Sequence, residues 1–254
     1  MSAHHLLRTL IFTLMLSGCA MTEEHDETKD WSVSQFYSEA KSALDDGDYD
    51  QAVKYYEGLE ARFPFGRYAT QAQLDIIYAH YKNDEPESAI AAANRFIKLH
   101  PQNPFVDYAY YLKGLTNLNR NQSFTSRYLP YDPTQRDAGA ALDSFNDFAE
   151  LVRRYPDSKY AADARNHMLQ LRNNLASYQI HVARYYMRRE AYLAAANRAN
   201  RVIKNFQRTD VVREALEIMV EAYTELGMTA LAGDARRVLT LNLEKGRLPA
   251  TRSE

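Results

Sequence analysis

The sequence predicts an all-α protein, an elongated α-solenoid of about five helix pairs. From Ser34 onward apolar residues recur at helical spacing, with few glycines and prolines. One helical unit also recurs along the chain, and repeats that cannot bury their apolar faces alone do so by stacking on their neighbours. An ordinary helical bundle is the alternative architecture.

The N-terminal residues predict an exported, lipid-anchored protein. Residues 1–18 combine a weakly basic start with a short apolar core. This core is well below the ~20 residues of a membrane-spanning helix, so we interpret the segment as a cleaved signal peptide. The residues Leu16-Ser17-Gly18-Cys19 resemble the lipobox of bacterial lipoproteins, in which the cysteine is acylated and begins the mature chain. Cys19 is therefore the predicted lipidation site, and the likeness implies a permanent tether.

The residues after Cys19 predict where the anchor lies and how it is joined to the domain. Residues 19–33 are polar and short of apolar contacts, as expected for a flexible leash. Ala20 follows the cysteine, and by the rule of this lipoprotein class in Gram-negative bacteria a residue other than aspartate implies the outer membrane. Because Cys19 is the only cysteine, an intramolecular disulfide is excluded.

The repeats align on one small residue that opens the second helix of each pair. These positions are Ala52, Ala89, Ser144, Ala195 and Ala232. The first and last intervals are close to the ~34 residues of a tetratricopeptide repeat, whereas the two middle intervals are longer. An aromatic residue follows four positions later, as at Tyr56 and Phe148, and proline then ends the helix because it lacks an N–H. The pattern resembles five degenerate tetratricopeptide helix pairs.

The insertions and ends divide the chain into segments. We expect repeats 1–3 in residues 34–156, with a polar loop at 119–136, and repeats 4–5 in residues 157–246, followed by a tail at 247–254. Between Tyr160 and Glu190 the helical pattern runs without a glycine or proline, which predicts one long helix.

The sequence lacks patterns typical of catalysis. It has no glycine-rich phosphate loop, no nucleophile elbow and no pair of histidines spaced for zinc. Asp163 and His167 stand four residues apart, which we interpret as a chance exposed pair. We therefore expect no enzyme activity, no cofactor and no metal site. The net charge of −2 argues against nucleic acid as the main partner.

Tyrosine is abundant, with 19 residues, and most fall at packing positions of the repeats. Structural packing is therefore the first interpretation. The second is an extended-peptide groove, because first helices line the concave wall of stacked pairs and aromatic tips grip peptides by apolar contact and hydrogen bonds. The candidate groove residues are Tyr68, Tyr78, Tyr81 and Tyr108.

A basic region lies at 184–208, where Glu190 is the only acidic residue. It is either a solvated helix face or a docking surface for an acidic partner. The packing stripe of this repeat is predicted to be Ala195, Ala199, Val202 and Phe206. Arg198 and Arg201 lie about 100° away on the helix, so we expect them to border that stripe and remain accessible.

Three segments carry a more specific resemblance. The runs FPFGRYATQAQLDIIYAHYKN, FVDYAYYLKGLTNL and LVRRYPDSKYAADA, together with the lipobox, resemble the BamD (ComL) family of the outer-membrane β-barrel assembly machinery. The resemblance covers nearly the whole chain. The sequence departs from the family at Gln207, where proline is expected, and in the loop 119–136.

The resemblance implies a non-catalytic lipoprotein on the periplasmic side of the outer membrane. Its partners would be BamA, other lipoproteins of the assembly machinery, and unfolded outer-membrane β-barrel proteins received on the N-terminal repeats. A BamA contact would lie at Asn197 and Arg198, with Arg201 nearby in the same basic region. The alternative function is a lipid-anchored tetratricopeptide adaptor in cell-envelope or peptidoglycan maintenance, or in DNA uptake. DNA uptake would need a basic groove, and the net charge of −2 argues against one.

Overall fold

The computed structural model describes residues 27–120 and 138–246 of the 254-residue chain. The signal peptide, Cys19, most of the leash, residues 121–136 of the polar loop and the C-terminal tail lie outside these ranges, so the expectations for them stay predictions. Two border residues are helical instead of lying in the predicted flexible segments. Val33, expected in the leash, is the first residue of a helix, and Asn119, expected in the loop, is the last residue of another.

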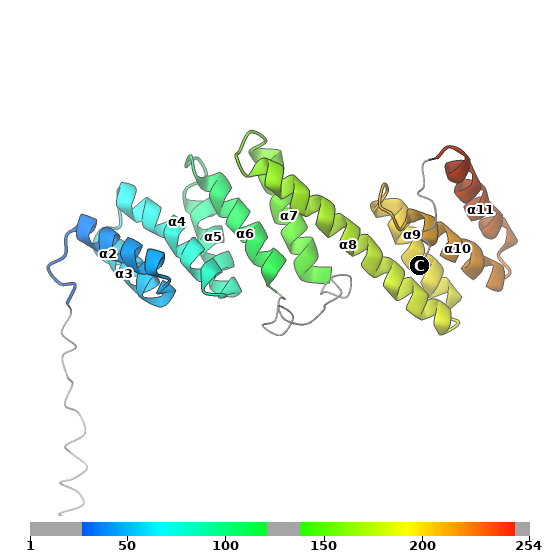
Figure 1. Ribbon diagram of the computed structural model, residues 1–254, viewed down its shortest axis with the longest axis horizontal. Helices are drawn as coiled ribbons and strands as arrows, with labels where there is room; N and C mark the ends of the chain where they lie inside the picture. Colours follow the sequence, from blue (N-terminus) through cyan, green and yellow to red (C-terminus); the bar gives the residue numbers. More distant parts are fainter. Residues whose placement is uncertain (1–26, 121–137, 247–254) are drawn as a thin grey trace, which may run out of the picture.

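The described residues form an all-helical row of helix pairs, without strands (Figure 1). Five pairs follow one another, and each helix packs against the next. The helices are α2 (Val33–Asp46), α3 (Tyr49–Arg62), α4 (Arg67–Lys82), α5 (Pro86–Leu99), α6 (Val106–Asn119), α7 (Ala138–Arg154), α8 (Ala161–Arg188), α9 (Tyr192–Asn205), α10 (Val212–Glu225) and α11 (Thr229–Glu244). The predicted α-solenoid is thereby confirmed.

Local sequence signals set the helix ends. The Ser32 and Asp48 side chains accept hydrogen bonds from the backbone N–H groups of Gln35 and Gln51, which caps α2 and α3. Gly47 ends α2 with a φ of 84°, a left-handed conformation that favours glycine. The second helices end before proline in the first three pairs. In the fourth pair α9 also ends, at Asn205, although Gln207 replaces that proline.

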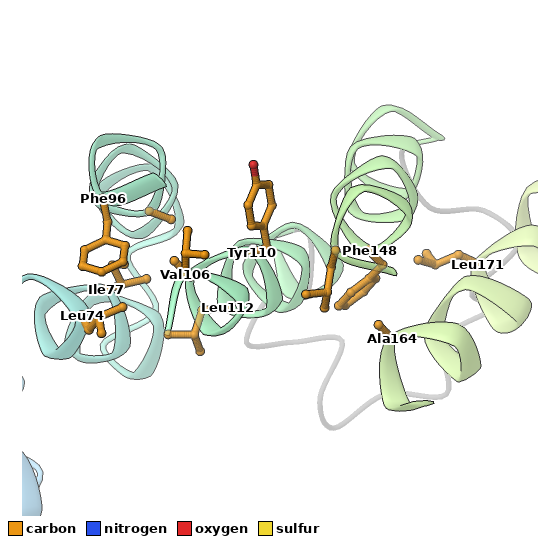
Figure 2. Packing of buried hydrophobic residues seen from close by; sticks show 12 residues of the cluster. Leu74, Ile77, Phe96, Val106, Tyr110, Leu112, Phe148, Ala164 and Leu171 are labelled. Atoms are coloured by element: carbon orange, nitrogen blue, oxygen red, sulfur yellow. The ribbon is translucent and has the colours of Figure 1, made fainter. Parts of the chain in front are cut away.

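The predicted small positions form the crossing points within the pairs. Ala52, Ala89, Ser144 and Ala195 are fully buried and Ala232 nearly so. The aromatic rings four residues later, Tyr56 and Phe148, are also fully buried. Figure 2 shows Phe148 from α7 facing α6 and α8, among the apolar side chains of the central cluster. Each ring therefore fills the space that a small neighbour leaves open.

The closest approach within a pair lies between α6 and α7. A Cβ added at Gly114 would lie 2.6–2.9 Å from three ring atoms of Phe148, where real Cβ contacts are essentially never found. The Ser144 hydroxyl donates a 2.9 Å hydrogen bond to the Gly114 carbonyl across the same crossing. Gly114 is thus required by contact rather than by backbone conformation.

The predicted long helix between Tyr160 and Glu190 is confirmed as α8, which has 28 residues. Its length is about 42 Å at ~1.5 Å per residue. The first half contributes Leu171 to the central apolar cluster, and the second half contributes Ile180 and Ala183 to the C-terminal cluster. One helix therefore joins the three N-terminal pairs to the last two.

First helices of neighbouring pairs also contact one another. Such packing joins α2 to α4, α4 to α6 and α8 to α10, whereas no comparable packing joins second helices of neighbouring pairs in the part that the structure describes. The row therefore curves with its first helices on the inner side, as the repeat pattern predicts. Within the described ranges, no helix combines the length and apolar character needed to cross a bilayer.

Substitution of Gly114 tests the close crossing. Gly114→Ala should destabilise the protein by about 1–3 kcal/mol, because the new methyl group displaces the Phe148 ring in a packed core. Urea unfolding would measure this. Gly233→Ala is the matched control, since its added Cβ lies 3.7 Å from a flexible arginine and it lies inside α11; it should be neutral or stabilising by up to ~1 kcal/mol. Equal stability of the two variants would contradict the crossing argument.

Candidate functional site

A row of tyrosines follows the inner side of the first helices. We call it the tyrosine row; it consists of Tyr37, Tyr68, Tyr78, Tyr81, Tyr108, Tyr111 and Tyr160. All seven are half-buried. The four predicted groove residues therefore lie on α4 and α6, with Tyr68 packed against the N-terminal cluster and Tyr81 and Tyr108 against the central one. Three further tyrosines extend the row to α2 and to the start of α8.

The first part of the row joins α2 to α4. The rings of Tyr37 and Tyr68 lie 5.3 Å apart between centroids, and the Tyr37 hydroxyl donates a 2.9 Å hydrogen bond to the Asp75 carboxylate. The Arg67 guanidinium lies over the Tyr68 ring, 4.9 Å from its centroid. Helical spacing explains the grouping, because residues 68, 71, 75 and 78 share one face of α4.

Asp75 is the polar centre of this contact. Its other carboxylate oxygen accepts a 3.0 Å hydrogen bond from the Gln71 amide. The fully buried Tyr56 hydroxyl lies near the same carboxylate but outside hydrogen-bond geometry. Burial raises the pKa of the Asp75 carboxyl, although the hydrogen bonds from Gln71 and Tyr37 oppose the shift. Burial and the Asp75 charge raise the pKa of Tyr37, so this phenol stays protonated and donates.

The second part of the row joins α6 to α8. The Tyr160 ring stacks on both Tyr108 and Tyr111, with centroids 5.3 and 4.7 Å away. The Tyr111 hydroxyl donates a 2.6 Å hydrogen bond to Asp163, and burial followed by this bond raises the pKa of that phenol. Asp163 also lies 3.2 Å from His167. This pair is exposed in part, as expected, but it belongs to the α6–α8 contact rather than being a chance arrangement.

The geometry of the row combines packing with binding capacity. Tyr81 accepts a 3.2 Å hydrogen bond from Asn119, so its ring also serves the α4–α6 contact. Half-exposed rings and protonated phenols can contact apolar side chains and donate to peptide carbonyls. In the ranges that the structure describes, no group of His, Cys, Asp or Glu is arranged to hold a metal ion. Sequence reasoning missed Tyr37 and Asp75, whose partner lies 38 residues away in the chain.

The basic region places its predicted contact residues on α9. Ala195, Ala199 and Val202 are fully buried, and the Phe206 ring packs against their cluster, so the predicted packing stripe is confirmed. Asn197 and Arg201 are exposed. Arg198 is less accessible than expected: it is half-buried and donates a 3.2 Å hydrogen bond to the Gln179 side chain on α8.

Internal pairing uses part of the basic region. Arg184 forms an ion pair with Glu214 on α10, and the Arg189 guanidinium lies 5.5 Å from the ring centroid of Tyr185. The cations nearest the end of α9 are exposed, namely Arg201, Lys204 and Arg208. The surface available to an acidic partner is therefore smaller than the sequence count indicates and lies toward the α9–α10 turn.

An apolar stripe on α11 is a further candidate surface, and sequence reasoning missed it. Leu231, Val238 and Leu241 follow helical spacing on one side of the helix and are 43–47% exposed. Ala232 and Ala235, on the adjoining strip of the helix, are buried. The signal was present in the sequence, because leucine and valine recur at helical spacing in this segment at positions that the repeat pattern does not assign to packing within the pair.

Comparison with known proteins gives a consistent result. Residues 29–239 match the family described as "YfiO: Outer membrane lipoprotein". The chain is 48% identical over 244 residues to "Outer membrane protein assembly factor BamD" of Neisseria meningitidis serogroup A / serotype 4A, covering 94% of this chain and 91% of that protein. The protein of the same name from Vibrio cholerae is 39% identical, covering 93% and 97% of the two chains.

Among solved structures, the crystal structure of MamA protein aligns with 87% of this chain and 98% of its own, at 13% identity and a TM-score of 0.36. At that level the alignment carries no argument about fold or function.

The raised pKa of Asp75 predicts a change of stability with pH that is opposite in sign to that of a salt-bridged aspartate. A carboxyl pKa raised on folding means that stability is lost as pH rises through that pKa, because the charged form is disfavoured in the folded state. Asp75→Asn keeps an acceptor for Tyr37 without the charge. Its stability relative to the parent chain should therefore improve between about pH 4 and pH 7.5, as urea unfolding at both values would measure.

Asp75→Ala is the control for this experiment, because it removes the acceptor as well as the charge. It should cost about 1–3 kcal/mol, since the Tyr37 and Gln71 groups then lose their partner. An Asp75→Asn variant that loses relative stability as pH rises would contradict the assigned shift.

Proposed function

This chain belongs to the BamD family of outer-membrane protein assembly factors, and on that premise we propose that it is a non-catalytic scaffold of the assembly machinery. In this role it docks on BamA through its C-terminal repeats and receives unfolded β-barrel proteins on its N-terminal repeats. Family membership rests on the match over residues 29–239 and on the identity to BamD proteins over most of the chain. The finer roles are assigned to surfaces below.

The two ends of the solenoid carry the docking proposal. The outer face of α2 is polar, with Ser34, Ser38 and Glu39 exposed, as expected for a terminal repeat that meets water. The outer face of α11 instead exposes Leu231, Val238 and Leu241. An apolar end face beside a basic region fits a protein partner that covers the C-terminal pairs and supplies carboxylates.

Arg198 is the proposed central contact of this interface. The Gln179 side chain holds the guanidinium partly buried, which limits its motion before binding. A pre-positioned planar guanidinium can bind a carboxylate through two hydrogen bonds, which lysine cannot do. Arg201 and Asn197 are exposed on the same helix and extend the contact.

The tyrosine row is the proposed surface for unfolded substrate. Tyr68, Tyr78, Tyr81 and Tyr108 lie on the inner side of the second and third pairs, where an extended segment would meet several rings in sequence. Aromatic rings contact varied apolar side chains, and phenols donate to backbone carbonyls, so such a surface binds peptides of differing sequence. This breadth suits a factor that handles many β-barrel chains.

The anchor and orientation complete the proposal. We assign lipidation to Cys19 and a periplasmic position to the helical domain at the inner leaflet of the outer membrane. Other lipoproteins of the machinery would bind the same scaffold. The lipobox resemblance supports the anchor, and the absence of bilayer-spanning helices in residues 27–120 and 138–246 is compatible with it.

Charge reversal at Arg198 tests BamA docking. Arg198→Glu should weaken BamA binding by about thirtyfold or more, as expected when an interface contact worth ~2 kcal/mol is lost. Pull-down of detergent-solubilised complexes would measure it. Arg165→Glu, an exposed arginine on the first half of α8, is the control and should retain BamA. Because Arg198→Glu also loses the hydrogen bond to Gln179, Arg198→Gln is tested beside it as a neutral variant, and an unchanged melting temperature shows that the variant is folded. Normal BamA recovery from both variants would place the contact elsewhere.

Site-specific crosslinking tests the substrate surface. A photo-crosslinking phenylalanine analogue at Tyr68, Tyr78, Tyr81 or Tyr108 should capture the C-terminal segment of an unfolded β-barrel protein, since an aromatic residue replaces an aromatic one. Asn94 on α5 is the control, because it is exposed on a second helix and thus on the opposite face. Capture at Asn94 but at none of the four tyrosines would refute the inner-side groove.

A further inference from the structure

Two phenylalanines are exposed at the tips of turns. Phe65 is 90% exposed in the α3–α4 turn, and Phe105 is 55% exposed at the end of the α5–α6 turn. Neighbouring helices of the solenoid alternate in direction, so both turns lie at the same edge, where the first helices begin (the upper edge in Figure 1). We call this the upper edge and the opposite one the lower edge.

The α3–α4 turn is built to hold its phenylalanine outward. Pro64 fixes its own φ near −65°. Gly66 has a φ of 101° and nothing within 4 Å of an added Cβ, so it turns the chain sharply in open space. Phe65 lies between these two residues and makes no contribution to the core. A large apolar side chain held outward in this way is available to an apolar partner.

The chain before α2 is held against the end of α3, next to the upper edge. Arg62, in the last turn of α3, donates hydrogen bonds to the backbone carbonyl and the hydroxyl of Thr28, the latter at 3.1 Å. The chain is thus fixed to this edge at residue 28, next to the turn that carries Phe65. The chain from Cys19 to Thr28 has nine residue-to-residue steps, which span at most about 30 Å when fully extended. An acylated Cys19 would therefore hold the upper edge within about 30 Å of the lipid surface.

Charge favours the same orientation. Exposed basic residues flank the two upper turns, Arg67 after the first and Lys98 before the second. Glu27 and Asp30 precede α2 and offset part of this charge. The lower edge of the same pairs is acidic, with Asp46 and Asp48 at the α2–α3 turn and Asp84 and Glu85 at the α4–α5 turn. Anionic lipid headgroups would attract the upper edge and repel the lower one.

The two phenylalanines lie toward the N-terminal end of the solenoid, as expected for a surface that an anchor at Cys19 would bring to the membrane. The later turns of the upper edge, at residues 155–160 and 206–211, expose polar and charged side chains such as Lys159 and Arg208. Exposed phenylalanines therefore occur in the two inter-pair turns nearest the tether. A membrane to which the chain is fixed at Cys19 would meet these turns first.

We propose that the upper edge of the first two pairs lies on the lipid surface, with Phe65 and Phe105 inserted at the headgroup level. This rests on the proposed lipidation of Cys19, which brings the edge to the bilayer. The contact adds a second attachment to the acyl anchor and sets the orientation of the solenoid, with the acidic lower edge away from the lipid. The tyrosine row, which runs between the two edges, stays open to the periplasm.

The test uses the full mature lipoprotein with one added thiol. Because Cys19 is the only cysteine and is acylated under the proposal, Phe65→Cys and Phe105→Cys each provide a single free thiol for an environment-sensitive fluorophore. The labelled protein is reconstituted into phosphatidylethanolamine–phosphatidylglycerol vesicles. We expect a blue-shifted emission at both sites and quenching by nitroxide-labelled lipid, whereas Asp46→Cys at the lower edge should stay in water.

The outcomes separate the membrane contact from the anchor. If the protein floats with vesicles but the emission of the probes at positions 65 and 105 matches that of the Asp46→Cys probe, the edge contact is overturned. The anchor then stands. Protein that fails to float, as expected of the Cys19→Ala variant, overturns the anchor and the edge contact together. Probes shielded only after other subunits of the assembly machinery are added would show that the edge binds protein instead of lipid.

Discussion

The close approach of paired helices is the constraint on which the rest of the structure depends. At Gly114 no side chain fits beside the Phe148 ring, and at Ala52 and Ala195 only a methyl group does. Because each helix packs mainly against the next one along the chain, stability is built pair by pair, and the described residues bury three apolar clusters in succession rather than one central core. The same constraint brings first helices together on the inner side, so the tyrosine row is a by-product of pair packing before it is a binding surface.

The repeat pattern explains why so much of the fold could be predicted. Small residues, aromatic residues and prolines at fixed offsets identify the crossings and the helix ends, and the uninterrupted pattern after Tyr160 identifies α8. These signals are local. The Asp75 contact with Tyr37 joins residues 38 positions apart in different pairs, and its partners follow from how the pairs stack rather than from either segment alone. The half-buried state of Arg198 has the same origin, because Gln179 belongs to another helix.

The long helix α8 joins the two halves of the described solenoid without a linker. The three pairs before it carry the tyrosine row, and the pairs after it carry the basic region and the apolar stripe of α11. A flexible connection would let these halves reorient, at a cost in entropy on binding. A single helix instead fixes their spacing, so the surfaces proposed for partner and substrate keep a constant separation.

The unlike ends of the solenoid decide how uncovered molecules would associate. Head-to-tail stacking needs an apolar face at both ends, and it would propagate into filaments. Here the N-terminal face of α2 exposes serine and glutamate, so the leucine–valine stripe of α11 has no complement there. Head-to-tail growth of uncovered molecules is therefore disfavoured, and the polar first helix acts as a chain terminator.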